Sequence, residues 1–403
     1  MSVSSATISC SNLWKVFGPD PESILDIADN GVTKQDLLEQ TGHVIAIKDA
    51  SFDIHEEEIF VVMGLSGSGK STLVRCLNRL IEPTKGDITI KGADLSAMTD
   101  DELREMRRND LSMVFQHFGL LPHRSVKDNV SFGLEIRGEH GQDKEEKAAQ
   151  AIDHVGLKGW ERSRIHELSG GMQQRVGLAR AIANGSDILL MDEPFSALDP
   201  LIRRQMQDEF ITMRDTMKKT VVFITHDLVE ALKLGDRVAI MRDGEIVQLA
   251  TPQEIVNEPA DDYVAEFVKD VPRGQVFAAD TVMEQPECVA VSEDSLADII
   301  KAMKKAKASF AFVNDSRGIG RGVLMLDQAE QMLKDGARSA DEAADKDYPS
   351  TAPGTMLDQC LPLVTEGDVP LAIVDGEGRF LGAVTRQALV QALQSGGGNG
   401  NGH

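Results

Sequence analysis

Short, almost wholly apolar runs alternate along the chain with longer segments in which apolar residues recur every three or four positions. The apolar runs are EIFVVMG at 58–64, LSMVFQ at 111–116, SDILLMDEP at 186–194 and KTVVFITHD at 219–227. Such runs are typical of strands that a parallel sheet buries on both faces. The helical patterns between them are Ser71–Leu80, Thr99–Arg108, Lys144–Val155, Gly170–Ala183 and Pro200–Met217. This alternation predicts a doubly wound α/β domain.

Strand patterns also lie on either side of this core. Residues 8–17 and 44–54 each predict a strand, and the polar, turn-rich residues 19–42 interrupt them. A short helical pattern at Thr33–Glu39 lies within the interruption, which we interpret as an insertion in a hairpin-like element. Residues 237–249 predict a terminal hairpin because an Asp-Gly pair divides two apolar runs.

The pattern changes in the last third of the chain. Residues 271–282 are interpreted as a linker. Beyond them, 310–326 and 371–386 form a weak internal repeat of strand, glycine-rich turn and strand, with helical patterns before and after each copy. The repeat predicts a small paired α/β module over 283–394. The glycine- and asparagine-rich residues 395–403 predict a flexible tail.

Charge and composition narrow the classes of function. The formal net charge is −23, from 65 acidic and 42 basic residues, which opposes nucleic-acid binding by phosphate neutralisation and direct adsorption to anionic lipid. No apolar run is long enough to span a bilayer, and the first residues do not have the pattern of a signal peptide. The four cysteines lack metal-site spacing, so reduced thiols in the cytosol are expected.

A phosphate-binding loop follows the first apolar run. GLSGSGKS, Gly64–Ser71, matches G-x-x-x-x-G-K-[ST] between a predicted strand and a predicted helix. Its glycines let successive backbone N–H groups surround phosphate oxygens. Lys70 places a cation at the β- and γ-phosphates, and the Ser71 hydroxyl suits Mg²⁺.

Polar side chains end three of the other apolar runs. Asp192 and Glu193 follow ILLM, at the strand end where open α/β sheets bind ligands. Adjacent residues of a strand point to opposite faces, so Asp192 suits the shell of Mg²⁺ and Glu193 suits the base that orients an attacking water. Gln116 and His226 end the neighbouring runs, where a contact with Mg²⁺, water or the γ-phosphate and a structural role both remain open.

A second anion-binding pattern occurs about a hundred residues after the first. LSGGMQQR places Ser169, Gly170 and Gly171 at the start of a long apolar-periodic helix. Backbone N–H groups at a helix N-terminus bind anions, and the helix dipole favours negative charge there. Since the chain already carries one phosphate loop, the residues alone leave open why it has a second such pattern.

Together, these motifs resemble those of the ATP-binding subunits of ABC transporters over about residues 8–270. The matching segments are the P-loop Gly64–Ser71, the Q-loop Gln116, the signature Leu168–Met172, the Walker B strand Ile188–Asp192 with Glu193, the D-loop Ser196–Asp199 and the switch His226. The resemblance implies an ATP-hydrolysing domain over 1–270 with a RecA-like P-loop NTPase core, an antiparallel β subdomain and a helical subdomain at about 99–165. It also implies binding of ATP and Mg²⁺.

The resemblance answers the question of the second anion site. In this family two protomers enclose two ATP molecules head to tail, and the signature helix of one binds the γ-phosphate held by the other. Met172 stands where the broad family most often has Gln, but the backbone donors remain. Phe17 matches the aromatic residue that stacks on adenine, with Trp14 as the competing candidate.

The resemblance therefore implies three sets of site residues. The nucleotide would be bound by Phe17, Ser66, Gly67, Ser68, Gly69, Lys70, Ser71, Thr72, Ser169, Gly170, Gly171 and Asp199. The metal would be held by Ser71, Gln116 and Asp192, and catalysis would fall to Glu193, His226 and Gln116.

A narrower resemblance is to the ATPase subunits of glycine betaine/proline betaine (quaternary-amine) importers. It rests on the insertion after Phe17, on FVVMGLSGSGKSTLVRCLNRLIEPTKG, and on SGGMQQRVGLARAIA with DEPFSALDPLIR. In that subgroup the C-terminal extension is a pair of CBS modules. Here MLDQA and VTRQA (325–329 and 384–388) depart from the ribose-binding pattern, so a structural or dimerising role stays open beside nucleotide binding.

The expected partners follow from this narrower resemblance. They are a second copy of the chain, an integral membrane permease contacting residues 112–135 and especially 122–133, and indirectly an extracytoplasmic substrate-binding protein. The chain would then lie at the cytoplasmic face of the membrane as a peripheral subunit. The alternatives are the ATPase of another organic-solute importer and an ABC ATPase without a transport role.

Overall fold

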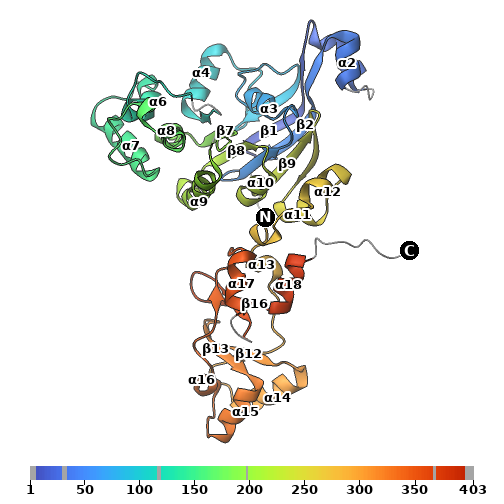
Figure 1. Cartoon of the computed structure of the whole chain (residues 1–403), viewed down its shortest axis with the longest axis vertical. Helices are drawn as coiled ribbons and strands as arrows, with labels where there is room; N and C mark the ends of the chain where they lie inside the picture. Colours follow the sequence, from blue (N-terminus) through green and yellow to red (C-terminus); the bar gives the residue numbers. More distant parts are fainter. Residues whose placement is uncertain (1–5, 30–33, 116–118, 197, 366–368, 395–403) are drawn as a thin grey trace. The chain divides into compact units, whose positions relative to one another are not determined.

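The computed structural model describes residues 6–29, 34–115, 119–196, 198–365 and 369–394. The chain divides into two compact units, Met1–Val268 and Lys269–His403 (Figure 1). Each unit has its own sheets and its own buried core. The two units are described separately below.

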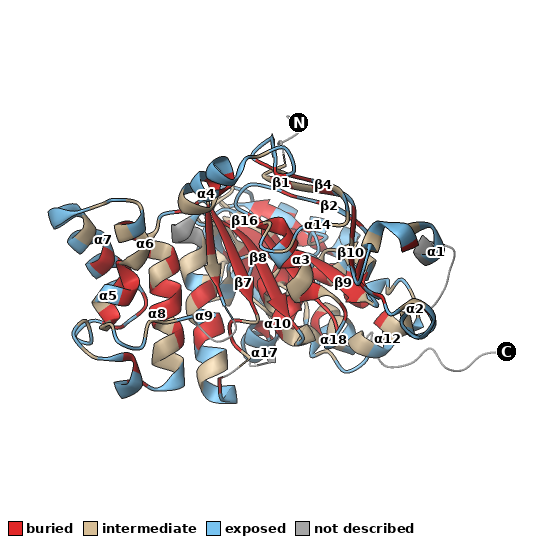
Figure 2. Cartoon of the chain, turned by 90° about the horizontal axis from the view of Figure 1, so that it is seen from above, coloured by how far each residue is buried: buried red, intermediate tan, exposed pale blue. Residues whose placement is uncertain are grey.

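A six-stranded sheet forms the centre of the first unit, in the order β10-β9-β3-β8-β7-β6. Its strands are β3 (Ile59–Met63), β6 (Leu111–Val114), β7 (Ile188–Asp192), β8 (Thr220–Thr225), β9 (Arg237–Arg242) and β10 (Glu245–Ala250). All pairs are parallel except β9 with β10. Every residue of β3, β7 and β8 is buried, as their apolar runs predict. Figure 2 shows this burial for β7 and β8. The doubly wound α/β prediction is confirmed.

The predicted Asp-Gly hairpin is the connection between β9 and β10. Asp243 and Gly244 have φ values of 53° and 91°. Two successive positive φ values are those of a type I′ turn, whose twist suits a two-residue hairpin. The backbone N–H of Gly244 donates to the Ser68 carbonyl at 3.0 Å, so this turn lies against the P-loop.

A four-stranded antiparallel sheet packs on the central sheet, in the order β2-β1-β4-β5. Its strands are β1 (Ile8–Phe17), β2 (Val44–Ile54), β4 (Lys85–Ile90) and β5 (Ala93–Asp94). The rings of Phe52 and Phe60 stack between the sheets with centroids 5.1 Å apart. The predicted strands 8–17 and 44–54 are confirmed as an antiparallel pair in which Phe17 faces Val44.

The insertion between β1 and β2 folds into short helices. They are the 3₁₀ helix η1 (Pro21–Ile24), α1 (Leu25–Asp29) and α2 (Lys34–Thr41), the last of which corresponds to the helix predicted at Thr33–Glu39. The insertion and the ends of the two strands share a small core formed by Trp14, Val16, Ile24, Leu37 and Ile45.

Helices cover the central sheet and extend beyond the β6 edge. They are α3 (Lys70–Leu77), α4 (Asp100–Asn109), α5 (Val126–Val130), α6 (Phe132–Ile136), α7 (Gly141–His154), the 3₁₀ helix η2 (Ile165–Glu167), α8 (Gly170–Ala183), α9 (Pro200–Met217), α10 (Leu228–Leu234), α11 (Pro252–Asn257) and α12 (Asp262–Val268). Helices α5, α6 and α7 gather around α8 beside β6 (Figure 2). Helix α4 starts with the predicted capping box of Thr99 and Glu102. Helices α5 and α6 were not predicted, because five residues are too few to show a helical period.

The second unit contains the predicted internal repeat. The first copy consists of β11 (Val289–Val291), α14 (Leu296–Ala306), β12 (Phe310–Asn314), β13 (Gly320–Met325), α15 (Leu326–Lys334) and α16 (Ala340–Ala343). The second consists of β14 (Ser350–Thr351), α17 (Leu357–Thr365), β15 (Leu371–Val374), β16 (Phe380–Val384) and α18 (Arg386–Gln394). Each copy has one three-stranded sheet.

The two repeats are joined through their hairpins. The Gly320 N–H donates to the Gly378 carbonyl at 3.1 Å, and the Phe380 N–H donates to the Gly318 carbonyl at 3.0 Å. The rings of Phe312 and Phe380 lie 4.6 Å apart between centroids. The two repeats therefore share one apolar layer, formed by Phe312, Val323, Ala372 and Ala383.

The segment 271–282, interpreted from the sequence as a linker, contains the 3₁₀ helix η3 (Arg273–Gln275) and α13 (Ala279–Val282). The Ala279 N–H donates to the Thr355 carbonyl at 2.8 Å, and the Leu357 N–H donates to the Phe277 carbonyl at 3.0 Å. This segment thus packs within the second unit. The predicted tail, 395–403, lies outside the described residues.

Candidate nucleotide site

The loop between β3 and α3 has the backbone that its glycines permit. Gly67 and Gly69 have φ values of 83° and 105°. A Cβ on Gly69 would lie 2.1 Å from the Ala46 carbonyl oxygen, so no other residue fits there. The Lys70 ammonium donates to the Gly64 and Leu65 carbonyls at 2.8 and 2.9 Å. The loop and its lysine therefore form one compact element whose geometry suits an anion.

Opposing effects act on the pKa of Lys70. Burial lowers its pKa, while the nearby carboxylates of Glu193 and Asp192 raise it. The lysine therefore lies between carbonyl acceptors and two anions, and a triphosphate would supply much stronger negative charge at the same point.

Ser71 and Asp192 meet below the loop. The Ser71 hydroxyl donates to Asp192 Oδ1 at 2.8 Å, and the Arg75 guanidinium lies 3.5 Å from Oδ2. Asp192 is 2% exposed at the end of β7. A hydroxyl and a carboxylate are the hard oxygen ligands that Mg²⁺ prefers, so this pair fits the expected metal. The third expected ligand, Gln116, lies outside the described residues.

Glu193 and His226 extend from the carboxyl ends of β7 and β8. Glu193 Oε2 lies 3.1 Å from His226 Nδ1. Glu193 has a φ of 48°, a left-handed conformation that is strained for a residue with a side chain. Its N–H donates to the Ile224 carbonyl at 3.1 Å, which holds this backbone in place. A carboxylate beside an imidazole is suited to orienting a water and accepting its proton.

An open cavity of about 770 Å³ connects these groups. Its lining residues are Phe17, Lys34, Val44, Ile45, Ala46, Leu65, Ser66, Gly67, Gly69, Lys70, Ser71, Thr72, Glu193 and His226. A volume of this size accommodates a nucleoside triphosphate. Most of the residues predicted from the phosphate-loop pattern line it. Ser68 does not line the cavity. Its side chain is buried, and its backbone carbonyl accepts a hydrogen bond from the Gly244 N–H, so it supports the loop.

The two aromatic candidates for adenine stacking have different positions. Phe17 is 41% exposed and lines the cavity, whereas Trp14 is 5% exposed and belongs to the small core under the insertion. The Lys15 ammonium lies 5.0 Å from the centroid of the Phe17 ring. The geometry favours Phe17 as the stacking residue.

Replacing Phe17 with Ala is expected to weaken ATP binding about tenfold or more, because base–aromatic stacking is worth about 1–3 kcal/mol. Equilibrium titration of the isolated chain with ATP measures the change. Phe17→Tyr should retain affinity. Trp160→Ala is the matched control, since Trp160 is 43% exposed and outside the cavity lining. Unchanged affinity in Phe17→Ala would remove Phe17 from the site.

The second anion-binding pattern forms a separate exposed surface. Ser169 caps α8, where its Oγ accepts from the Met172 N–H at 3.3 Å. A Cβ on Gly171 would lie 2.8 Å from the Ile202 methyl group of α9, whereas one on Gly170 would meet no neighbour within 4 Å. Asp199 caps α9 by accepting from the N–H groups of its first turn at 3.1 and 3.2 Å.

The described residues that line the cavity do not include these signature and D-loop positions. Within one chain, the structure joins Phe17, the P-loop, Glu193 and His226 around the cavity. It leaves Ser169, Gly170, Gly171 and Asp199 outside it, as expected if they face another chain's nucleotide.

Lys34 is a cavity residue that the sequence did not identify. It comes from the insertion, for which the sequence pattern indicates no chemical role. The available signal was its place in a segment that starts directly after Phe17.

An apolar groove of about 310 Å³ lies where the sequence predicts contact with a membrane subunit. Its lining residues are Leu111, Ser112, Met113, Phe115, Gly119, Phe132, Gly133, Arg180, Ala181 and Asn184, from β6, α6, α8 and the adjoining loops. The Arg180 guanidinium donates to the Gly119 carbonyl at 2.8 Å, and burial lowers its pKa. An exposed aromatic residue beside a fixed cation makes this groove a suitable docking surface.

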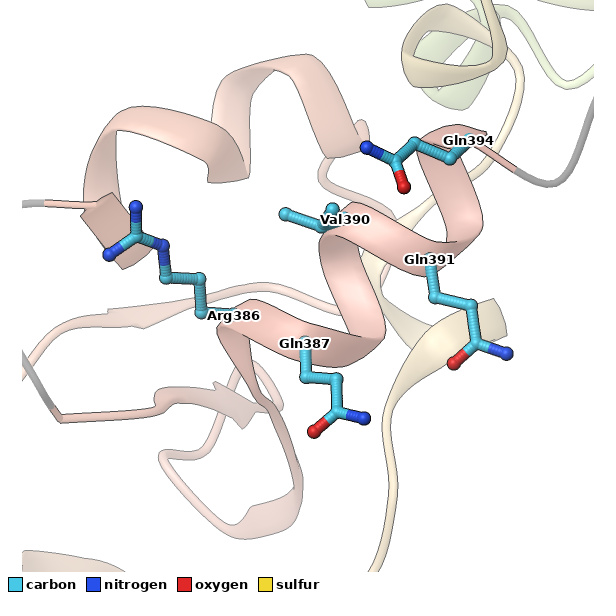
Figure 3. A pocket seen from close by; sticks show the side chains of 5 residues that line it. All are labelled: Arg386, Gln387, Val390, Gln391 and Gln394. Carbon is cyan, nitrogen blue, oxygen red and sulfur yellow. The ribbon is translucent and has the colours of Figure 1, made fainter. Parts of the chain in front are cut away.

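The second unit has a hollow of about 630 Å³ along α18. Figure 3 shows its lining residues Arg386, Gln387, Val390, Gln391 and Gln394, all from this one helix. These side chains supply amides and one guanidinium, but no carboxylate, thiol or imidazole. The Thr385 hydroxyl of the VTRQA stretch accepts from the Ala388 N–H at 3.1 Å and so caps the helix.

Two further findings concern metals and membranes. No group of three or more His, Cys, Asp or Glu side chains gathers as a metal site in the part of the chain that the structure describes. A magnesium ion at Ser71 and Asp192 would take its other ligands from Gln116, phosphate oxygens and water. Among the same residues, no helix combines the length and the apolar character needed to cross a bilayer.

Comparisons with known proteins agree with this geometry. Residues 47–196 match the ABC transporter family. The chain is 45% identical to the glycine betaine/carnitine transport ATP-binding protein GbuA of Listeria monocytogenes, over 96% of the chain and 97% of that protein. It is 44% identical to the glycine betaine/proline betaine transport ATP-binding protein ProV of Salmonella typhimurium, over 96% and 98%. A trimethylamine N-oxide transport ATP-binding protein, TmoW of Pelagibacter ubique, is 48% identical over 72% and 85%.

Solved structures show the same fold. A dimeric bacterial ABC transporter cassette aligns with a TM-score of 0.52 and 29% identity, over 61% of this chain and 98% of that one. The same cassette was also solved as a dimer in a post-hydrolysis state bound to ADP and Pi.

Proposed function

The chain belongs to the family of ABC transporter ATP-binding proteins and is an ATP hydrolase, and from this we propose that it powers the import of a betaine-type quaternary amine. The observation that carries the proposal is the extent of the match. The relatives named for glycine betaine align with 96% of the chain, a length that extends well into the second unit.

The second candidate solute is trimethylamine N-oxide. The relatives named for its transport are 48% and 50% identical to this chain, slightly more than those named for glycine betaine. Their alignments cover only 72% and 68% of the chain. The more complete alignment along the chain therefore favours glycine betaine or a close analogue.

In the proposed mechanism, Phe17 holds the base and the P-loop holds the phosphates. Lys70 exchanges its carbonyl acceptors for the β- and γ-phosphates. Glu193 orients the attacking water and accepts its proton, and His226 fixes the position of the Glu193 carboxylate through the 3.1 Å contact. Magnesium, held by Ser71, Asp192 and Gln116, would neutralise phosphate charge.

Two copies of the chain form the working ATPase in this proposal. The signature residues Ser169–Gly171 of one copy bind the γ-phosphate of the ATP held by the other. Their position outside the cavity of their own chain supports this arrangement, and so does the dimer of the solved cassette. In a pair related by a two-fold axis, the signature residues of each copy meet the P-loop of the other, so the dimer has two equivalent ATP sites.

Membrane attachment would come from a permease. The groove beside β6 and α8 is the proposed docking site, and it would hold the chain at the cytoplasmic face of the membrane. An extracytoplasmic binding protein would deliver the solute to the permease. The two joined repeats at 283–394 support the assignment of the second unit as a CBS-like regulatory pair.

The proposed transport role predicts ATPase activity that responds to solute. The chain, reconstituted with its permease and binding protein in liposomes, should hydrolyse ATP several-fold faster with glycine betaine or proline betaine. Choline, carnitine and trimethylamine N-oxide complete the panel, each at low and high salt. A response to methionine or a polyamine alone would favour another importer, and failure of the chain to copurify with any membrane protein would favour a role outside transport.

A further inference from the structure

The insertion 19–42 is fixed against the strands that carry Phe17. Leu37 is fully buried and Ile24 is 4% exposed in the core that they share with Trp14. At the entrance, a Cβ on Gly18 would lie 2.3 Å from the His43 ring, and His43 Nε2 lies 2.5 Å from the Pro19 carbonyl oxygen. The insertion is therefore anchored at both ends beside the cavity.

Lys34, the first residue of α2, lines the nucleotide cavity together with Phe17 and the P-loop. It belongs to the segment between Phe17 and Val44, which are cross-strand partners. Both partners also line the cavity. Lys34 thus lines the same cavity as the aromatic ring and the P-loop, with the carboxylates of Asp243 and Glu245 nearby.

The position of Lys34 is electrostatically unfavourable for the chain alone. Burial lowers its pKa, and the carboxylates of Asp243 and Glu245 oppose that shift only in part. Glu245 already pairs with Lys48 at 2.5 Å. Among the residues that the structure describes, no ion pair or hydrogen bond of the Lys34 ammonium is found. A cation at a helix N-terminus is also disfavoured by the helix dipole.

We propose that Lys34 is a nucleotide-binding residue whose ammonium contacts the α- or β-phosphate of the ATP bound by the same chain. This inference rests on the ATP site proposed above. The α- and β-phosphates lie between the base and the γ-phosphate, and Lys34 lines the cavity together with Phe17 and the P-loop. The insertion is then part of the ATP site, and an anion there compensates the desolvated cation.

The test compares Lys34→Gln with the unchanged full-length chain by equilibrium binding of ATP and ADP, and of adenosine in competition. Affinity for ATP and ADP should fall about tenfold, which corresponds to one charge-assisted contact. Affinity for adenosine should stay unchanged, and Lys34→Arg should restore most of the loss. Lys158→Gln removes the same charge from an exposed loop residue and should have no effect.

Unchanged ATP affinity in Lys34→Gln would overturn the inference, as would equal losses for ATP, ADP and adenosine. A loss for ATP alone would also overturn it, because it would place the contact beyond the β-phosphate. Lys70→Ala separates this failure from that of the proposed function. If Lys70→Ala loses ATP binding while Lys34→Gln does not, only the role of Lys34 fails. If Lys70→Ala binds ATP normally, the proposed ATP site itself is wrong.

Discussion

Glu193→Gln is expected to bind ATP with unchanged affinity and to hydrolyse it about 10²- to 10⁴-fold more slowly, the usual contribution of a general base. Glutamine keeps the size of the side chain and the hydrogen bond to His226, but it accepts no proton at neutral pH. The left-handed backbone at this position is also retained, so the fold should be unaffected. Phosphate release and equilibrium ATP binding, measured on the same preparation, separate chemistry from affinity.

The same variant should accumulate as an ATP-bound dimer in size-exclusion chromatography, because hydrolysis is the step that reopens the pair. Glu105→Gln is the matched control, since Glu105 lies on the surface of α4 and pairs only locally with Arg108 and Asn109. Hydrolysis by Glu193→Gln at the wild-type rate would contradict the assignment of the base.

Ser169→Arg is expected to abolish hydrolysis while each monomer still binds ATP. Ser169 lies outside the cavity of its own chain, so the substitution should not affect ATP binding in that cavity. Arginine would fill the space meant for the partner's γ-phosphate and remove the cap of α8, at a cost of about 1 kcal/mol. Thr99→Arg removes the cap of α4 in the same way and should leave hydrolysis intact.

Mixing variants tests the arrangement in trans. A dimer of one Ser169→Arg chain and one Lys70→Ala chain contains one complete site, made by the P-loop of the first and the signature of the second. Each mixed dimer has one of the two sites of a C₂ pair, and random pairing makes about half of the dimers mixed. An equal mixture of the two inactive proteins should therefore regain about a quarter of the normal activity. Loss of monomeric ATP binding in Ser169→Arg, or no recovery in the mixture, would contradict the shared site.

The sequence predicted the elements with strong local signals. Helix α8 runs over Gly170–Ala183 as predicted, because its capping serine and its apolar period agree. Helix α5 was missed although Ser125 and Asp128 form a capping box, since the motif precedes only five helical residues. A motif alone, without a period to confirm it, is weak support for a helix.

The residues of the candidate site were predictable where they belong to a single sequence motif. They were less predictable where segments far apart in the sequence come together. Alternation along β1 separates Trp14 and Val16 from Lys15 and Phe17, but the sequence does not indicate which face meets the nucleotide. The fold decides this, because the insertion covers Trp14 and leaves Phe17 at the cavity. Leu37 and Ile24 pack the insertion onto the two strands, and this packing holds Lys34 at the cavity. The sequence pattern did not predict the packing.

The apolar layer shared by the two repeats has a consequence for how the second unit folds. Phe312 and Val323 from one repeat, and Ala372 and Ala383 from the other, are each at most 2% exposed in this layer. Neither repeat could fold alone without exposing its half to water, so both must form in one cooperative transition. A change that destabilises one repeat therefore also lowers the free energy of unfolding of the other. The second unit then has one stability, which both repeats determine together.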